Sequence, residues 1–265
     1  MDLKNSAYKA EFFNYYYFFK KAFKLKNTMK VLIVDERIDE RCERALMKEG
    51  FFLLKLPADK RLGDGVCSHP DTLLFYSDGQ IITTAEYAED ALYFFTDIRE
   101  YSPSTRLRFT DEKRGAEYPT DCIMNALVIG RRIFCKADTV SEGIREYAAK
   151  HGYELIHTRQ GYPACSVLAF GNAAITADEG LALLLEKYGV RVTRISQGGI
   201  SLPPHQYGFI GGASGVVGDK IYFFGNIYMH PDGERICEAI RDVGFTPVSL
   251  CNEKLTDLGG IIALQ

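Results

Sequence analysis

Residues 160–196 read QGYPACSVLAFGNAAITADEGLALLLEKYGVRVTRIS, and this stretch contains one complete structural repeat of the chain. Two short apolar segments meet at Gly171-Asn172, a dipeptide typical of tight hairpin turns. The segment DEGLALLLEKYG then spaces apolar residues three and four apart, as an amphipathic helix does, and it ends at Gly189, where a left-handed C-cap is favoured. A third apolar segment, VRVTRIS, follows. The stretch therefore predicts a β-turn-β-α-β unit.

The same pattern occurs five times along the chain. The second strands of successive units start at offsets of 49, 52, 41 and 47 residues, at Leu32, Ile81, Ile133, Ala174 and Ile221. A helical stretch follows each of them, and four of these stretches end at a glycine: Gly50, Gly152, Gly189 and Gly244. A third strand comes next in every unit, with RLRFT (106–110) in the divergent second one. Repetition at this period indicates an array of like units, each about 47 residues long.

The two ends of the array complement each other. The first unit opens at Met29 with MKVLIVDE and lacks the leading strand of the other units, whereas the chain ends with a spare apolar segment, LGGIIALQ (258–265). We expect this terminal strand to complete the first unit and close the array into a ring. Closure would also remove exposed sheet edges, which invite aggregation.

Five ββαβ units around a pseudo-fivefold axis resemble the pentein fold, an α/β propeller. It is the fold of the guanidino-group-modifying enzymes (arginine deiminases, amidinotransferases and dimethylarginine hydrolases) and of the ribosome anti-association factor six. The resemblance covers residues 29–265 and implies one propeller domain over that range. GFIGGASGVVGDKIYFFG (208–225) and LTDLGGIIAL (255–264) resemble late-unit segments of the family. In the enzymes a catalytic cysteine follows the glycine pair closely, but here Ile261, Ile262 and Ala263 do.

Composition excludes several classes of function. The net charge is −3 and the pI is near 6.0, so the chain has no basic character of the kind that nucleic-acid binding requires. No apolar run reaches the ~18 residues that span a bilayer. The seven cysteines are dispersed without CxxC pairs, which is typical of reduced thiols in a cytoplasmic protein. We expect a cytoplasmic protein with no nucleic-acid partner, no membrane partner and no cofactor.

Residues 1–28 differ from the rest of the chain. AEFFNYYYFFKKAFKLKN (10–27) is rich in Phe, Tyr, Lys and Asn, and it lies outside the five-unit register. One interpretation is an extension upstream of the folded domain. The other is an amphipathic helix that lies on a membrane surface, because aromatic and lysine side chains alternate. We favour the extension.

A chain that starts at Met29 is expected to keep its fold. The segment 1–28 has no counterpart in any repeat, so its loss should leave the circular dichroism spectrum and the melting temperature nearly unchanged. A large drop in melting temperature would show that the segment packs on the propeller.

Candidate functional residues gather where each unit begins. In the pentein fold the first strand of every unit runs near the central channel, so the residues that enter these strands converge there. In this sequence the entering segments supply Asp64, Cys67, His69, Asp71, Asp121, Cys122, Asn125, Cys165, Ser166, Ser214 and Asp257. We predict that Asp121, Cys122, Asn125, Ser166, Ser214 and Asp257 bind a small molecule in the channel.

His69, Asp71 and Cys165 are the predicted catalytic residues. Strand alternation would set His69 and Asp71 of HPD on one face, where the carboxylate could orient the imidazole as a base. Cys165 would be the nucleophile, provided that His69 lowers the pKa of its thiol. The structural alternatives are that His69 and Asp71 belong to a turn and that Cys165 is a packing residue of the core.

A metal site is a further alternative for these residues. CSHPD offers Cys67, His69 and Asp71, to which Cys122 or Cys165 could add a ligand. Structural zinc sites normally show paired short spacings such as CxxC, and this sequence has none. We therefore predict no metal.

Two functions remain from this reasoning. The first is a cysteine-dependent hydrolase or transferase that acts on a small guanidino or amide compound. The second is a non-catalytic binding protein on the same fold, similar to the anti-association factor. The distances among His69, Asp71, Cys122 and Cys165 should distinguish them, because only the enzyme needs these side chains around one cavity.

Overall fold

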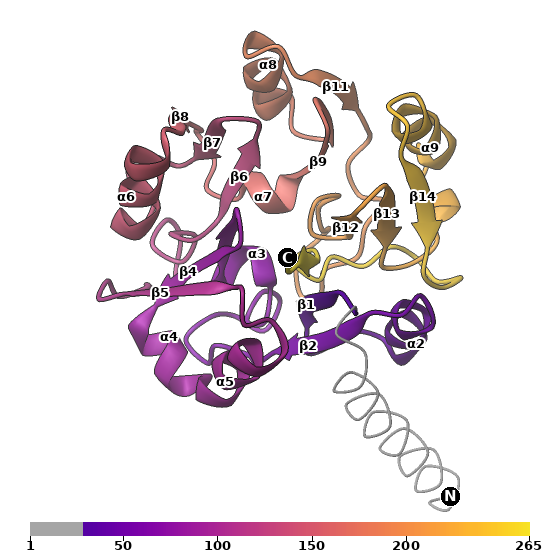
Figure 1. The fold of residues 1–265 in the computed structure, drawn as a ribbon. Helices are drawn as coiled ribbons and strands as arrows, with labels where there is room; N and C mark the ends of the chain where they lie inside the picture. The colour runs from indigo at the N-terminus through magenta and orange to yellow at the C-terminus, as the bar shows by residue number, and fades with distance from the viewer. Residues whose placement is uncertain (1–28) are drawn as a thin grey trace, which may run out of the picture.

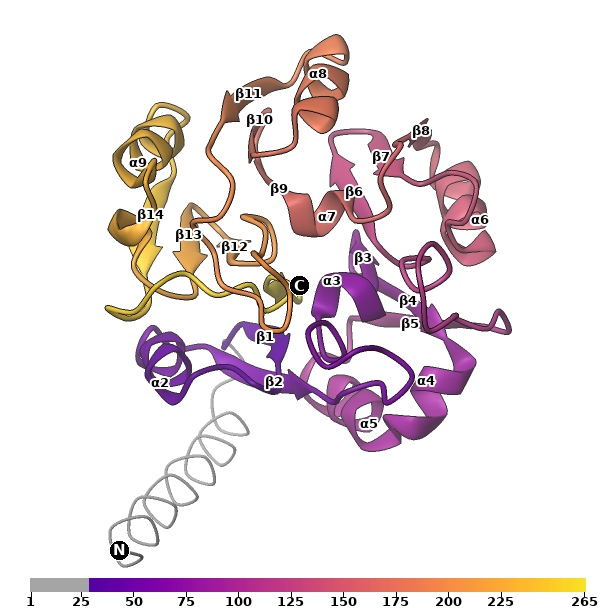
Figure 2. The same cartoon turned by 180° about the vertical axis from the view of Figure 1, so that it is seen from behind.

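A computed structural model describes residues 29–265, and the predicted extension 1–28 lies outside the described residues. Five three-stranded sheets surround a common centre, with the longer helices on the outside (Figure 1). The view from behind shows the same arrangement (Figure 2). The coarse prediction of a pentein-like α/β fold built from five similar units is confirmed.

The strands follow one order in every unit. The sheets, each written from its first to its third strand, are β15 (Ile262–Ala263), β1 (Val31–Asp35) and β2 (Phe52–Leu56); β3 (Phe75–Ser77), β4 (Gln80–Thr84) and β5 (Arg106–Thr110); β6 (Ala126–Ile129), β7 (Arg132–Cys135) and β8 (Glu154–His157); β9 (Val167–Phe170), β10 (Ala173–Thr176) and β11 (Arg191–Arg194); β12 (Ser214–Val217), β13 (Lys220–Phe223) and β14 (Thr246–Ser249). The first pair of strands is antiparallel and the second pair is parallel throughout.

Helices connect the two parallel strands of each unit, because parallel neighbours need a crossover. They are α2 (Glu40–Lys48), α4 (Ala85–Asp90), α5 (Leu92–Tyr101), α6 (Glu142–His151), α8 (Glu179–Lys187) and α9 (Gly233–Arg241), the last preceded by the 3₁₀ turn η1 (Ile227–Met229). The four glycines predicted as C-caps all have positive φ, between 69° and 88°. Two short helical turns, α3 (Pro70–Leu73) and α7 (Pro163–Ser166), precede β3 and β9.

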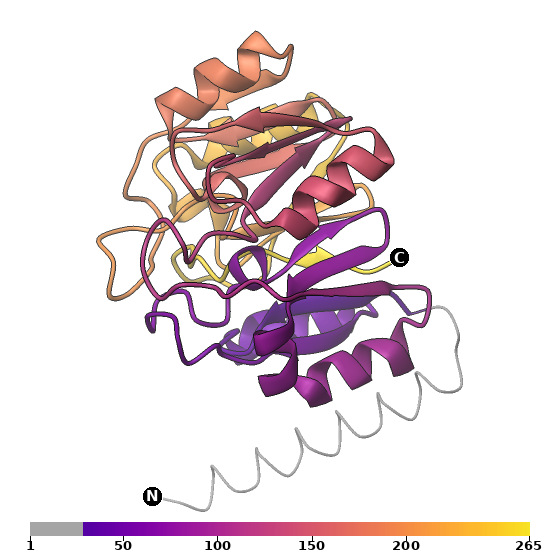
Figure 3. The ribbon, with the colours of Figure 1, turned by 90° about the vertical axis from the view of Figure 1, so that its left-hand side faces the viewer.

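The C-terminal strand lies beside the first unit, as predicted. β15 pairs antiparallel with β1 through Leu32 and Ala263 and through Ile33 and Ile262, and so occupies the first-strand position of that unit. In the side view this segment, drawn in yellow, runs through the middle of the molecule (Figure 3). That the pairing closes a cooperatively folding ring stays a prediction.

The apolar cores lie between the units rather than inside them. Five buried clusters are found among the described residues, and each combines side chains from two neighbouring units. The cluster between the last and first units packs Leu32 and Val34 of β1 with Tyr222 of β13 and Phe224. Each unit therefore depends on both neighbours for burial of its apolar faces, which contributes ~25 cal/mol per Å² of apolar surface.

The five first strands enclose a channel cavity of about 370 Å³. Its wall is mostly apolar or glycine, and Asp71 is the one charged residue among the described residues that line it.

None of the helices within 29–265 combines the length and hydrophobicity that crossing a membrane requires.

Candidate active site around Cys165

Two prolines set up the site. Pro70 and Pro163 occupy the first turn of α3 and α7, where the fixed φ of proline suits a helix start and its missing N–H costs nothing. His69 is the residue immediately before α3, and Cys165 lies within α7. The expected strand alternation of His69 and Asp71 is wrong, because α3 is a helical turn; the turn nevertheless leaves both side chains close together.

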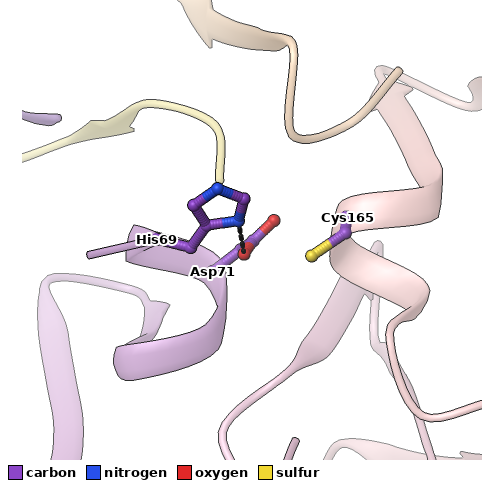
Figure 4. Close-up of side chains that lie close together, drawn as sticks. All are labelled: His69, Asp71 and Cys165. Atoms are coloured by element: carbon purple, nitrogen blue, oxygen red, sulfur yellow. Dashed lines mark ion pairs between the residues drawn. The ribbon is translucent and has the colours of Figure 1, made fainter. Parts of the chain in front are cut away.

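The two turns face each other, and Cys165 points toward Asp71 (Figure 4). The imidazole Nδ1 of His69 lies 4.0 Å from Asp71 Oδ1. The nearest ligating atoms of His69, Asp71 and Cys165 all lie within 4.8 Å of one another. The three residues predicted to be catalytic are therefore brought together, although they come from units two and four.

His69 is surrounded by carboxylates. Asp257 Oδ1 lies 3.8 Å from Nδ1, and Asp35 Oδ2 lies 3.9 Å from Nε2. The imidazole is fully buried, and neither ring nitrogen has a hydrogen-bond partner among the described residues. Burial lowers the pKa of His69 to about 4, and Asp35 only partly opposes this effect. His69 is therefore neutral at pH 7 and able to accept a proton.

Asn125 holds the thiol of Cys165. Its Nδ2 donates to Sγ at 3.1 Å, and its Oδ1 accepts from the backbone N–H of Ala164 at 2.8 Å. The second bond fixes which end of the amide faces the sulfur. On the other side Thr72 Oγ1 lies 4.0 Å from Sγ. The sulfur is thus positioned by polar groups, which a simple packing cysteine does not need.

The pKa of the Cys165 thiol is raised well above its ordinary value. Burial is the main cause, and the charges of Asp71 and Asp257 add to it. The expectation that His69 lowers this pKa is therefore not met in the unliganded protein, because the imidazole is neutral while the carboxylates can be charged. Burial also raises the pKa of Asp71 to about 6 and that of Asp257 to about 7.

A cavity of about 430 Å³, here called the site cavity, adjoins these side chains. His69, Cys165 and Asp257 line it, together with Asp121. The loop 195–213 contributes His205 and further residues to its wall. His69 and Cys165 thus face the site cavity, whereas Asp71 lines the channel cavity and contacts His69 from there.

Gly259 packs directly against the backbone and Cβ of His69. A Cβ added to Gly259 would lie 2.4 Å from the His69 Cβ and 2.5 Å from its Cα, and the glycine has a φ of +67°. The neighbouring Asp257 accepts from the backbone N–H groups of Phe209 at 2.8 Å and Gly259 at 3.1 Å. The C-terminal segment therefore positions both His69 and Asp257.

Gly259→Ala is expected to disturb the site. An alanine at this φ costs ~1–2 kcal/mol, and the clash with the His69 backbone adds ~1–3 kcal/mol. Gly50→Ala is the matched control, because Gly50 has a φ of +88° but an added Cβ would meet nothing within 4 Å. Urea denaturation should show a clearly larger loss of stability for Gly259→Ala. Equal losses would mean that the His69 backbone yields easily.

Not all of the predicted binding residues reach this site. Ser214 donates to the Ile210 carbonyl at 2.7 Å and lines the channel cavity. Ser166 accepts from Gln160 and lines a third cavity, and Cys122 donates to the Pro119 carbonyl at 3.2 Å. None of these three lines the cavity that His69 and Cys165 face, and a binding role for any of them stays a prediction.

Sequence reasoning missed several residues of the site. Asp35 ends β1, is fully buried, and accepts from Ser68 Oγ at 2.7 Å and from Arg37. An acid that ends an apolar strand was a signal that could have revealed it. His205 and the aromatic residues of the loop 195–213 carried no such signal, because nothing local in their sequence indicates which cavity they line.

The His69, Asp71 and Cys165 side chains are also of the types that bind a metal ion. Within residues 29–265 they are the group found close enough to share one. Cys67, which the sequence had offered as a ligand, is not in this group. A 4.8 Å spread is wider than bonds of ~2.0–2.3 Å to one zinc ion comfortably allow, so the side chains would have to move inward.

Solved structures with a similar fold include three enzymes. A dimethylarginine dimethylaminohydrolase from Pseudomonas aeruginosa in complex with citrulline is 16% identical, with a TM-score of 0.53 over 84% of this chain and 92% of that one. An inosamine-phosphate amidinotransferase from Streptomyces griseus is 12% identical (TM-score 0.53, 89% and 94% covered). An agmatine deiminase from C. jejuni is 9% identical (TM-score 0.51, 86% and 90% covered).

These similarities establish the fold of the chain, but at this level of identity they do not establish its activity. No curated protein matches the chain in sequence. Residues 33–262 match a family described as a family of unknown function, DUF6873. The chain therefore belongs to the DUF6873 family, and its fold is similar to that of these enzymes.

Proposed function

We propose that this protein binds a small amidine or guanidine cation in the site cavity and that Cys165 attacks its central carbon. The observation that carries the proposal is the grouping of His69, Asp71 and Cys165 within 4.8 Å, with His69 and Cys165 on the wall of that cavity. Asp257 on the wall of the site cavity and Asp71, which lies beside His69 and Cys165 on the channel side, provide the negative charge that a planar cation next to Cys165 would pair with through charge-assisted hydrogen bonds. The similar solved structures, which include hydrolases and amidinotransferases, support chemistry of this class.

The bound cation would itself activate the thiol. Asp71 and Asp257 raise the pKa of Cys165 while they are unpaired. A cation placed between them cancels their field at the sulfur, so the thiol pKa falls only when substrate is present. The thiol proton then passes to neutral His69, after the side chains close the remaining distance on binding. An empty site would keep the thiol protonated and protected from oxidation.

The covalent steps balance as follows. The sulfur forms a bond to the amidine carbon, and the C=N electron pair moves onto nitrogen. Protonated His69 gives its proton to the leaving amine as the C–N bond breaks and the nitrogen lone pair re-forms the C=N bond, which leaves a cationic isothiouronium (from a guanidine) or thioimidate (from an amidine) on the Cys165 sulfur. A water, deprotonated by His69, then attacks the same carbon and releases the thiol. An acceptor amine in place of water would make the protein a transferase.

Asp71→Asn should change the reactivity of Cys165 in opposite directions for two reagents. Removing the charge lowers the thiol pKa, so neutral 2-chloroacetamide should label Cys165 faster, by about threefold per pKa unit after the loss of nucleophilicity. Cationic 2-chloroacetamidine should label it at least about tenfold more slowly, because one charge-assisted contact is lost. Rates come from peptide mapping at pH 8.

Asp64→Asn is the control for this experiment, because Asp64 is an exposed acid in the preceding loop. It should leave both labelling rates unchanged. If Asp71→Asn shifts both rates the same way, Asp71 does not act through its charge on the thiol.

A divalent metal ion is a second candidate ligand of the same group, because a thiol, an imidazole and a carboxylate are brought together. Metal analysis of the purified protein and of Cys165→Ser would test it. One equivalent of zinc in the first protein and none in the variant would favour a metal site.

A further inference from the structure

We propose that the ligand of this site carries a second positive charge and no carboxylate, so that it is an aminoalkyl guanidine or amidine rather than an α-amino acid. The inference rests on the proposed function, because it assumes that one cationic end lies beside Cys165. The charges on the cavity walls indicate the chemistry of the other end of the ligand.

No lysine or arginine lines the space available to such a ligand, as far as residues 29–265 are concerned. The site cavity of about 430 Å³ is continued by a neighbouring cavity of about 290 Å³, here called the tail cavity. Tyr162, Tyr207 and Phe209 line both, so a ligand passing between them would lie against aromatic rings. The acidic residues and histidines on the two walls are His69, Asp121, Asp178, His205, His230 and Asp257.

Three basic side chains that lie close to wall residues already have acidic partners. Arg37 pairs with Asp35. Arg114 is buried and pairs with Asp59 at 3.2 Å. Lys136, whose Nζ lies 5.9 Å from the Tyr118 ring at the tail cavity, is 3.7 Å from Asp138. A ligand carboxylate would therefore enter a space bounded by carboxylates, without a cation to receive it.

Asp121 is the residue to which a second cationic group of the ligand would bind. It lies on the wall of the site cavity and is only 8% exposed. Its Oδ2 accepts from the Tyr162 hydroxyl, but its Oδ1 is buried without a hydrogen-bond partner among the described residues. A buried carboxylate oxygen without a partner is costly, and an ammonium group supplies donors and the opposite charge together.

The aromatic residues between the cavities suit the linker of such a molecule. Tyr207 and Phe209 stack edge to face with ring centroids 6.0 Å apart, and Tyr118 and Tyr162 lie 6.1 Å apart. These rings offer apolar surface to a methylene chain and negative faces to a cation. The site would thus recognise a cation at Cys165, an alkyl chain along the rings and a second cation at Asp121.

Three matched guanidines test the inference. Agmatine has the guanidine and a terminal amine, butylguanidine has the same chain without the amine, and L-arginine adds a carboxylate to the agmatine skeleton. Titration calorimetry on Cys165→Ser, which cannot turn ligand over, gives the three dissociation constants. We expect agmatine to bind at least about tenfold more tightly than butylguanidine, through one charged hydrogen bond, and at least about a hundredfold more tightly than arginine.

Asp121→Asn in the same background should abolish most of the agmatine advantage. The affinity for butylguanidine should stay within about twofold, because that ligand has no group for Asp121 to bind. Glu117→Gln is the matched control, since Glu117 is an exposed acid in the same loop, and it should leave all three affinities unchanged.

The outcomes separate the two proposals. Arginine binding as tightly as agmatine, or butylguanidine doing so, overturns the inference and leaves the proposed function standing. An agmatine advantage that survives Asp121→Asn overturns the role of Asp121. If no guanidine binds while the Cys165→Ser protein remains folded by circular dichroism, the proposed function fails and the inference fails with it.

Discussion

Cys165 is expected to react with 2-chloroacetamidine at least about a hundredfold faster than with 2-chloroacetamide at pH 7.5. The two reagents have nearly the same shape, but only the amidine carries a positive charge. Each charge-assisted hydrogen bond to Asp71 or Asp257 contributes ~1.5–3 kcal/mol, or about tenfold to a hundredfold in rate. Sulfur displaces chloride in both reactions, so the ratio reports recognition of the cation. Peptide mapping after brief labelling measures it.

The preference should also depend on pH. Ionised carboxylates bind the cation, and the pKa values of Asp71 and Asp257 are raised to about 6 and about 7. The amidine rate should therefore climb steeply between pH 5 and pH 8. The ratio of the amidine rate to the acetamide rate should rise over the same range, because the neutral reagent gains nothing from the ionised carboxylates.

Cys122 provides an internal control for this experiment. It is also buried, and burial raises the pKa of its thiol to about 11, but it lies outside the His69 group. Cys122 and the other thiols should react slowly and show no large preference for the amidine. His69→Ala should slow the labelling of Cys165. Slow, uniform labelling of all seven cysteines, unaffected by His69→Ala, would make Cys165 a packing residue and favour the non-catalytic binding protein.

Deleting residues 259–265 is expected to unfold the protein. The deletion removes the antiparallel partner of β1 and the side chain of Leu264, which is 5% exposed and whose burial contributes ~1.5–3 kcal/mol. It also removes backbone bonds from Leu264 to Val31 and from Asp71 to Gly259, at ~1 kcal/mol each. The sum approaches the ~5–15 kcal/mol that typically stabilises a domain. Loss of the cooperative thermal transition in circular dichroism would show it.

Removing Gln265 alone is the control for that deletion. Gln265 is exposed and follows the last buried residue, so the shortened chain should melt within a few degrees of the full protein. If the chain lacking 259–265 also keeps its native melting behaviour, the first and last units do not depend on the terminal strand, and the ring model is wrong.

Local sequence predicted the repeated unit. Turn residues such as Asp78-Gly79 adopt positive φ, the four glycine caps do so too, and the helices between the parallel strands carry the predicted apolar spacing. These features depend on residues within a few positions of each other, where backbone sterics and periodicity decide the conformation. The number of strands also predicts the pairing of the terminal strand, because the first unit lacks one strand and the C-terminal segment supplies one more than the last unit needs.

Local sequence also predicted which side chains form the site, but it did not predict their pKa values. His69, Asp71 and Cys165 meet as predicted, yet the helical turn of α3 replaces the expected strand. A thiol beside an imidazole predicts a lowered thiol pKa, whereas burial and the charges of Asp71 and Asp257 raise the pKa of Cys165, and burial keeps His69 neutral.

The sequence by itself determined the five units, their turns and their order along the chain. Only the tertiary structure decided which side chains from different units face one another. Asp257 and His69 are separated by 188 residues but lie 3.8 Å apart, and Asn125 contacts Cys165 from another unit. A pKa or a cavity wall depends on burial and on charges within a few ångströms, and those neighbours come from distant parts of the chain. No periodicity encodes them.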